Sequence, residues 1–280
     1  MPSAHDPASA PETLPTLEIA AGETLTLPAR TYRYANIAIA PGGILSIAEN
    51  ARQWLILHCE GDARVYGTIV FRGFHSTTDP VEAQAPDGER MRHRFVQDNL
   101  GGDGGDGGSK GVGNRGGRGA HGTADHGGGG GGAGFNGRPN MQPGGDASAW
   151  RGGRSGGHRP HGDGGDGGRR LRAGNGGLLY LYVGGSFDAT GGRIELAGLD
   201  GPAGVNGGAG TGGGAVGTGP AGGGGGAPGG EGGRLVVKAA RIAGDLPTVN
   251  VQGGAGGAGG RGYRNGRAGE AGLAGMVDYL

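Results

Sequence analysis

Glycine recurs in three-residue units through the second part of the chain, and this repeat restricts the fold more than any other feature. Of the 77 glycines, 70 follow Leu100, in tracts such as GGDGGDGGS at 101–109 and GGAGGAGGRG at 253–262. Three residues per turn is the repeat of polyproline II, which has no internal hydrogen bonds and leaves its N–H and C=O groups free to pair with neighbours. Because glycine has no Cβ, such rods can touch. The repeat therefore predicts bundled glycine-rich rods.

The composition argues against an ordinary apolar core and against two simpler glycine-rich classes. Only 34% of the residues are hydrophobic and 5% are aromatic. Collagen needs glycine at every third position with abundant proline, whereas this repeat breaks often and only 15 prolines are scattered along the chain. Disorder is the remaining alternative, but flexible linkers rarely contain patterned apolar strands like those between these tracts.

Charge, cysteine content and hydropathy exclude further classes. The formal net charge is zero, so no long-range field attracts nucleic acid or an acidic membrane. The single cysteine, Cys59, rules out an intramolecular disulfide framework, and its position in the apolar run WLILHC predicts a buried, inert thiol. The first 15 residues lack the apolar segment of a signal peptide, and no stretch of 18 apolar residues occurs. We therefore expect neither secretion by a leader nor membrane insertion.

Short strands are predicted before the glycine-rich tracts. Four prolines within residues 1–15 indicate a semi-rigid attachment arm. From 17 to 73 polar and apolar residues alternate, a turn signal arrives every eight to twelve residues, and no helical period is present. This pattern predicts an all-β fold, whereas residues 74–100 are charged and are expected to be irregular.

A weak internal repeat links three segments. The runs that begin at Trp54, Leu178 and Arg234 share one plan, which is an apolar strand, a turn, a second short strand and a glycine-rich tract. The second strands are predicted at 68–71, 193–196 and 248–251, and glycine follows at 73, 198 and 253. The spacing between repeats is uneven, which excludes a solenoid of equal coils but suits a β scaffold from which glycine-rich excursions depart and return.

These observations predict one architecture. It is an all-β protein in which a short-strand scaffold carries a bundle of polyglycine or polyproline II helices, without significant α-helix. Residues 1–15 would be the attachment arm, 16–100 an N-terminal β domain for attachment, and 101–280 a glycine-rich domain interleaved with strands. The first tract, 101–177, is too long to run in one direction and must fold back several times before residue 178.

The glycine-rich part resembles the adhesins and fibre-tip proteins of tailed bacteriophages, particularly the distal long-tail-fibre adhesins of T-even-like phages. The matching features are the tracts at 101–109, 207–214, 222–233 and 253–262, their alternation with strands, and the ending GEAGLAGMVDYL. The resemblance covers residues 101 to 280 and rests on composition and topology. It implies packed polyglycine II helices displayed at the end of a fibre.

The resemblance also implies a function and partners. Such a protein would be a non-enzymatic virion component of the tail, made in the host cytoplasm and acting at the host cell surface. Its partners would be other tail or fibre proteins, bound through the N-terminal region, and a bacterial receptor that is a protein, a pilus or a polysaccharide. A homotrimer is compatible with the resemblance, because fibres are often trimeric, and so is a single copy. A purely structural fibre spacer or cap, another glycine-rich surface adhesin and an ice-binding protein are the alternatives.

The sequence motifs that would indicate nucleotide binding, catalysis or metal binding are weak. GVGNRG at 111–116 fits a nucleotide-binding fingerprint but lacks a surrounding βαβ unit. GRSGG around Ser155 fits a nucleophile elbow but lacks the strand-to-helix turn. Paired acidic residues could hold Ca2+, yet solvated edges or ion pairs with Arg169 and Arg170 fit the pattern better. These acidic residues are Asp103, Asp106, Asp163 and Asp166, and the histidine pairs considered for metal binding are His121 with His126 and His158 with His161. The histidines lack cysteine or glutamate partners at zinc-site spacing, so we expect no cofactor, metal site or catalytic residue.

Bulky side chains within the glycine-rich tracts are the candidate receptor-binding residues. Exposed aromatic and arginine side chains are the usual composition of binding hot spots. An equally weighted alternative is that they seal the rod bundle against the β scaffold. The candidates are Phe135, Trp150, Arg151, Arg154, His158, Arg159, His161, Tyr263 and Arg264.

Overall fold

The structure is a computed structural model of the 280-residue chain. It describes residues 14–48, 53–74, 81–88, 90–93, 100–101, 126–127, 174–204, 206, 226–261, 265–266 and 268–280. These residues form strands, turns and extended segments without a helix, which confirms the all-β prediction. Accordingly, the described part contains no helix that could cross a membrane.

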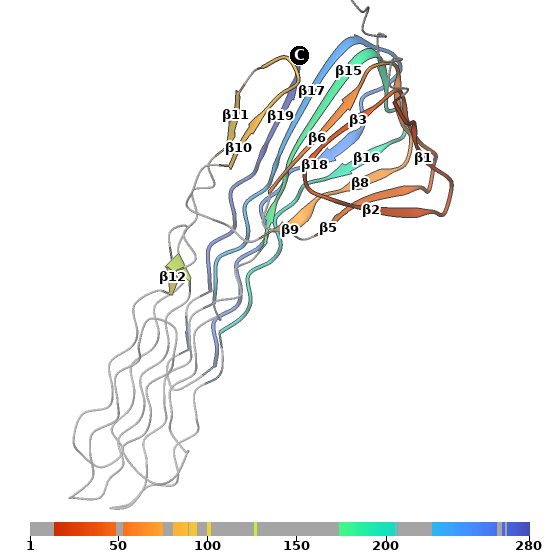
Figure 1. Ribbon diagram of the computed structural model, residues 1–280. Coiled ribbons are helices and arrows are strands. Elements are labelled where there is room, and N and C mark those ends of the chain that lie inside the picture. Colours follow the sequence, from red (N-terminus) through yellow and green to blue (C-terminus); the bar gives the residue numbers. More distant parts are fainter. Residues whose placement is uncertain are drawn as a thin grey trace, which may run out of the picture.

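Most strands stack in parallel as three faces of a solenoid (Figure 1). The first face contains β1 (Leu17–Ile19), β4 (Ile37–Ile39), β7 (Ala63–Val65) and the end of β15 (Leu178–Asp188). The second contains β2 (Thr24–Pro28), β5 (Ile44–Ala48), β8 (Thr68–Val70), β16 (Arg193–Glu195) and β18 (Thr248–Asn250). The third contains β3 (Thr31–Tyr34), β6 (Trp54–Cys59), the start of β15, β17 (Arg234–Ile242) and β19 (Met276–Tyr279). Successive strands from the first, second and third faces form one coil of the solenoid. Each coil therefore lies directly on the preceding coil.

Three short pairs complete the strands. An antiparallel pair joins β9 (Arg72–Phe74) to β14 (Asn175–Gly176). A second antiparallel pair is the hairpin of β10 (Val81–Gln84) and β11 (Arg90–His93). A parallel pair joins β12 (Leu100–Gly101) to β13 (His126–Gly127).

The corner between the first and second faces repeats one tight turn. The N–H of Gly43 donates to Ala40 O at 2.8 Å, and Gly42 before it has φ +79°. Proline at the second position and a positive-φ glycine at the third are typical of a type II turn. The same four-residue bond recurs from Gly192 N to Ala189 O, again after a positive-φ glycine. This turn directs the chain to the second face after β4 and after β15, whereas β7 reaches β8 through only Tyr66 and Gly67.

The core is a set of apolar ladders that run across the coils. On the second face, register places Leu45 beside Ile69 and Ile69 beside Ile194, all fully buried. On the third face, Leu55, Leu179 and Leu235 are paired in the same way. Parallel stacking puts equivalent residues of successive coils side by side, so a similar side chain is needed in each coil.

The hairpin of β10 and β11 covers the outer side of the third face. Its apolar side chains pack against the outward-facing Ile56, Tyr180 and Val236, which are buried. The strands of the third face are therefore buried on both sides, which explains their continuous apolar runs. The expectation that residues 74–100 are irregular is wrong for 81–84 and 90–93, because their alternating side chains have this apolar surface to cover.

The structure confirms the three-segment repeat and extends it. Arg193 pairs with both Thr68 and Thr248, and Leu178 pairs with both Trp54 and Arg234. Sequence reasoning did not extend the repeat to the first two coils, whose strands β1 to β6 stack in the same three faces. The coils are unequal because the glycine-rich excursions leave the solenoid at the end of the second face.

Four glycine-rich segments, 196–204, 226–233, 251–261 and 268–275, run side by side away from the solenoid (Figure 1). Their backbone bonds recur at every third residue. The first and third segments run parallel, with Gly198, Gly201 and Gly204 donating to the carbonyls of residues 252, 255 and 258 at 2.7–2.9 Å. The second returns antiparallel to the first, with residues 227, 230 and 233 donating to residues 202, 199 and 196. We call this set the glycine lattice.

Candidate functional site

All nine predicted receptor-binding residues, from Phe135 to Arg264, lie outside the described residues. The same holds for Ser155, the 111–116 motif, the four aspartates and three of the four histidines considered for metal binding. His126 lies in β13, where only the backbone is described. Among the residues that the structure does describe, no group of three or more His, Cys, Asp or Glu side chains could hold a metal ion.

The glycine lattice buries glycines at regular intervals and leaves side chains between them on its surface. In segment 251–261, Gly254, Gly257 and Gly260 are buried, whereas Ala255 and Ala258 are exposed. A Cβ at Gly254 would lie 1.9 Å from Leu199 O, which is far inside contact distance. Gly254 also donates to Gly230 O at 2.8 Å and accepts from Gly272 N at 2.8 Å, so this segment contacts three neighbours. The lattice therefore requires glycine on its inner side and tolerates other residues on its outer side.

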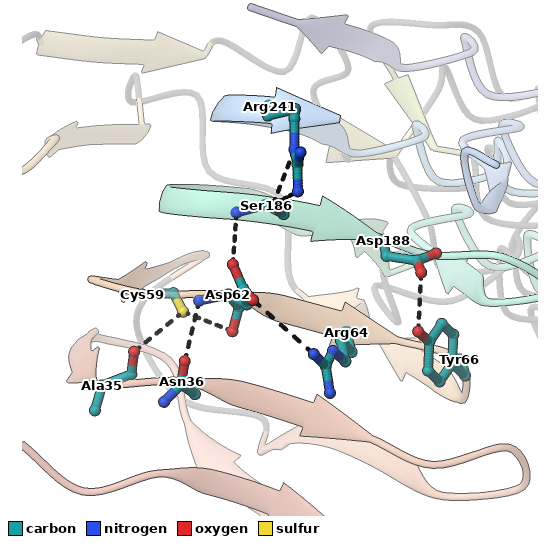
Figure 2. A network of polar contacts seen from close by, with 9 residues as sticks. All are labelled: Ala35, Asn36, Cys59, Asp62, Arg64, Tyr66, Ser186, Asp188 and Arg241. Carbon is teal, nitrogen blue, oxygen red and sulfur yellow. Dashed lines mark hydrogen bonds and ion pairs between the residues drawn. The ribbon is translucent and has the colours of Figure 1, made fainter. Parts of the chain in front are cut away.

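A polar ladder joins four coils at the corner between the third and first faces (Figure 2). Asp62 donates its N–H to Asn36 Oδ1 at 3.0 Å, and its own Oδ1 accepts from Ser186 N at 2.9 Å. Ser186 Oγ in turn accepts from Arg241 Nη2 at 2.8 Å. Each coil thus binds the next through a side chain at the same corner position. Sequence reasoning missed this ladder, because unequal coil lengths hide the common position of its residues.

Cys59 lies behind this ladder and is fully buried, which confirms the predicted burial. Its thiol contacts the carbonyl of Asp62 at 3.2 Å. Burial raises the pKa of the Cys59 thiol, so the reactive thiolate is disfavoured.

A second polar group lies at the next corner (Figure 2). Tyr66 donates its hydroxyl to Asp188 Oδ2 at 2.9 Å, and Asp188 Oδ1 accepts from both the N–H and the hydroxyl of Thr190. The N–H and hydroxyl of Thr190 and the hydroxyl of Tyr66 donate to the carboxylate of Asp188, and these bonds lower its pKa. The bond between Tyr66 and Asp188 raises the pKa of Tyr66. The phenol ring is therefore held in one position.

A groove of about 400 Å³ lies beside Tyr66 on the outer side of the first face. Its lining includes Glu18, Ala38 and Arg64, which stand in one register row, and the turn residues Ala40 and Pro41. The groove exists because a methyl group stands between two long charged side chains. The alternation of polar and apolar residues along each strand is sufficient to predict that Glu18 and Arg64 face outward. Only the register between coils places them on either side of Ala38.

A second outward row crosses the third face beside the hairpin. Register places Arg33, His58, Tyr182 and Lys238 in line. His58 meets Tyr182 edge to face at a centroid distance of 4.9 Å. Arg33 pairs with Glu60 at 2.7 Å, and Lys238 pairs with Asp87 of the hairpin. Both cations therefore have acidic partners within the chain, so the row presents no excess of positive charge.

No protein-family model, curated protein or solved structure matches this chain. The class that can be stated from the structure is a parallel β-solenoid of unequal coils with glycine-rich excursions.

Proposed function

We propose that this protein is a non-enzymatic attachment protein, a tail-fibre or tail-tip component of a phage virion that recognises a receptor on the host surface. The observation that carries the proposal is the glycine lattice, whose backbone bonds at every third residue tie the excursions to the coil register of the solenoid. Such a lattice positions surface residues without an apolar core beneath them.

The proposal includes polyglycine II packing of the excursions. Three features support it, which are the three-residue period of the bonds, the three neighbours of Gly254, and the absence of positive φ among the described lattice glycines. Polyproline II has a negative φ and three residues per turn. Each lateral bond adds about 1 kcal/mol, so many are needed to replace a core.

In this proposal, the side chains between the glycines contact the receptor. Residues on the outer side of a lattice can vary in type without disturbing the packed backbone, as the exposed Ala255 and Ala258 illustrate. Loops on a rigid scaffold are the usual location of binding residues. We assign receptor contact to the bulky residues of the tracts, particularly Trp150, Arg151 and Tyr263.

Competition with phage adsorption tests the proposal. Purified protein is expected to bind host cells and to slow adsorption of the phage that encodes it. Substituting Trp150→Ala and Arg151→Ala together is expected to weaken cell binding about 100-fold, as for loss of two hot-spot residues, while Ala258→Ser leaves binding unchanged. Absence of binding to every host strain that the phage infects would contradict the proposal.

A purely structural fibre spacer is the second candidate. The observation that favours it is the polar ladder that joins four coils, since this ladder stiffens the solenoid without forming a binding site. Exchange of residues 150–161 for those of a related fibre separates the candidates. An altered host range supports recognition, and an unchanged host range with intact fibres supports the spacer.

A further inference from the structure

The groove beside Tyr66 has the shape and chemistry of a small binding site, and it lies on the solenoid rather than on the glycine lattice. Its volume of about 400 Å³ lies within the range of small-molecule sites. It is formed by the outward side of β1, β4 and β7 and by the turns that follow them. Binding in this groove does not depend on receptor binding by the glycine-rich tracts.

The backbone beneath the middle of the groove is already paired on both sides. β4 lies between β1 and β7, and β7 lies between β4 and the end of β15. An extended peptide binds a sheet by adding a strand to an open edge, and the middle of this face offers no such edge. A ligand in the groove must therefore be recognised by side chains.

The groove has two charged side chains at opposite sides, the hydrogen-bond acceptor Glu18 and the hydrogen-bond donor Arg64. Glu18 and Arg64 stand on either side of Ala38, two strand spacings or about 10 Å apart. Arg64 is available for a ligand, because its side chain is 63% exposed and its contact with Asp62 is a long 3.9 Å. A carboxylate only accepts hydrogen bonds and a guanidinium only donates them. Arg64 also stands beside Asp188 in the register and near Asp62, so the groove has no unbalanced positive charge to attract an anion. This favours an uncharged ligand with hydroxyl groups on two sides.

The remaining walls are apolar and rigid. Ala38, Ala40 and Pro41 form a floor of small side chains. Tyr66 stands at the rim with its hydroxyl held by Asp188 at 2.9 Å, and Thr190 holds Asp188 in turn. A side chain fixed in this way loses little entropy when a ligand binds. An apolar floor, an aromatic wall and hydroxyl-binding groups at both ends match the two faces and the rim of a sugar ring.

We propose that this groove binds a neutral hexopyranose unit of a glycan. The ring lies over Ala38, with hydroxyl groups donating to Glu18 on one side and accepting from Arg64 on the other. Tyr66 covers one edge of the ring. The bound sugar is recognised without metal or covalent chemistry.

Saturation-transfer NMR on the full chain tests the proposal. The probes are glucose, galactose, mannose and N-acetylglucosamine, together with their β- and α-linked trimers, each at 10 mM. At least one probe is expected to receive saturation, and glucuronate is expected to receive less than glucose. Absence of transfer to every neutral sugar would overturn the proposal, and stronger transfer to glucuronate would overturn the neutral ligand class.

Four variants locate the site. Ala38→Leu fills the groove and is expected to abolish transfer, whereas Ala240→Leu, at an exposed position on β17, leaves it unchanged. Glu18→Gln and Arg64→Gln are each expected to weaken binding about 10-fold, as for loss of a charged hydrogen bond. Thermal unfolding of each variant separates lost binding from lost folding. Transfer that persists in a folded Ala38→Leu protein would overturn the assignment of this groove. If Ala38→Leu does not fold, unchanged binding in Glu18→Gln and Arg64→Gln would overturn it.

Discussion

Ala255 donates its backbone N–H to Asp200 Oδ1 at 2.7 Å, across a sequence separation of 55 residues. The same separation relates Arg241 to Ser186 and Asp245 to Thr190 within the solenoid, and Arg261 to Asn206 further along the lattice. The last two coils therefore keep one register through the change from strand to glycine-rich segment. The lattice is a continuation of the coils rather than a separate body attached to them.

Gly254→Ala is expected to destabilise the protein by about 3 kcal/mol or more, because the new methyl group meets the backbone carbonyl of Leu199 at 1.9 Å. The free energy of unfolding in urea measures the effect. Ala255→Ser is the matched control, since residue 255 is exposed. Equal stability of the two variants would contradict the close approach of these segments.

Asp62→Ala is expected to lower the free energy of unfolding by about 1–2 kcal/mol, because the partly buried N–H of Ser186 loses the carboxylate that accepts its bond. Asp245→Ala removes an equally charged but exposed side chain and is expected to change stability by less than about 0.5 kcal/mol. Chemical denaturation of both variants measures the difference. A loss no larger in Asp62→Ala than in Asp245→Ala would show that the ladder adds nothing to coil stacking.

The protein is expected to lose stability as the pH falls below about 6.5, the ordinary histidine value. Burial lowers the pKa of His93, with a further contribution from Arg234, and burial also lowers the pKa of His58 beside Arg33. The unfolded chain therefore binds protons at a higher pH than the folded chain, so unfolding is favoured as the pH falls. Urea midpoints at pH 7.5 and pH 5.5 test this, and His93→Gln is expected to reduce the difference. A higher midpoint at pH 5.5 would contradict the direction of both shifts.

Cys59 is expected to resist thiol reagents in the native protein and to react fully in urea, because it is fully buried and its pKa is raised. Reaction with a chromogenic disulfide measures both states. An Ala255→Cys variant supplies an exposed thiol on the lattice and is expected to react at once. Rapid native reaction of the wild-type protein would mean that the corner around Asp62 opens.

The sequence predicted the strands well where local pattern was sufficient. Alternation indicated the strands between 17 and 73, and the shared plan of three segments gave Thr68, Arg193 and Thr248 equivalent positions. The structure pairs these residues in register. The hairpin at 81–93 was not predicted, because its apolar residues pack against a surface that Ile56, Tyr180 and Val236 form from three coils. The groove was not predicted for the same reason, since Glu18, Ala38 and Arg64 belong to three different coils.

The sequence by itself determined that the backbone is extended, as strands and glycine-rich segments. After Leu100, glycine in three-residue units leaves the tracts too little apolar surface for a core of their own and allows their backbone segments to approach closely, whereas the alternating apolar residues of the strands supply the core of the solenoid. The tertiary structure decided which residues meet. Excursions of unequal length separate the coils along the sequence, and only their stacking brings Asp62 to Ser186, Asp200 to Ala255 and Tyr66 to Asp188. The separations of these three pairs, 124, 55 and 122 residues, follow from the lengths of the excursions, whereas the hydrogen bonds themselves depend on the register in which the coils stack.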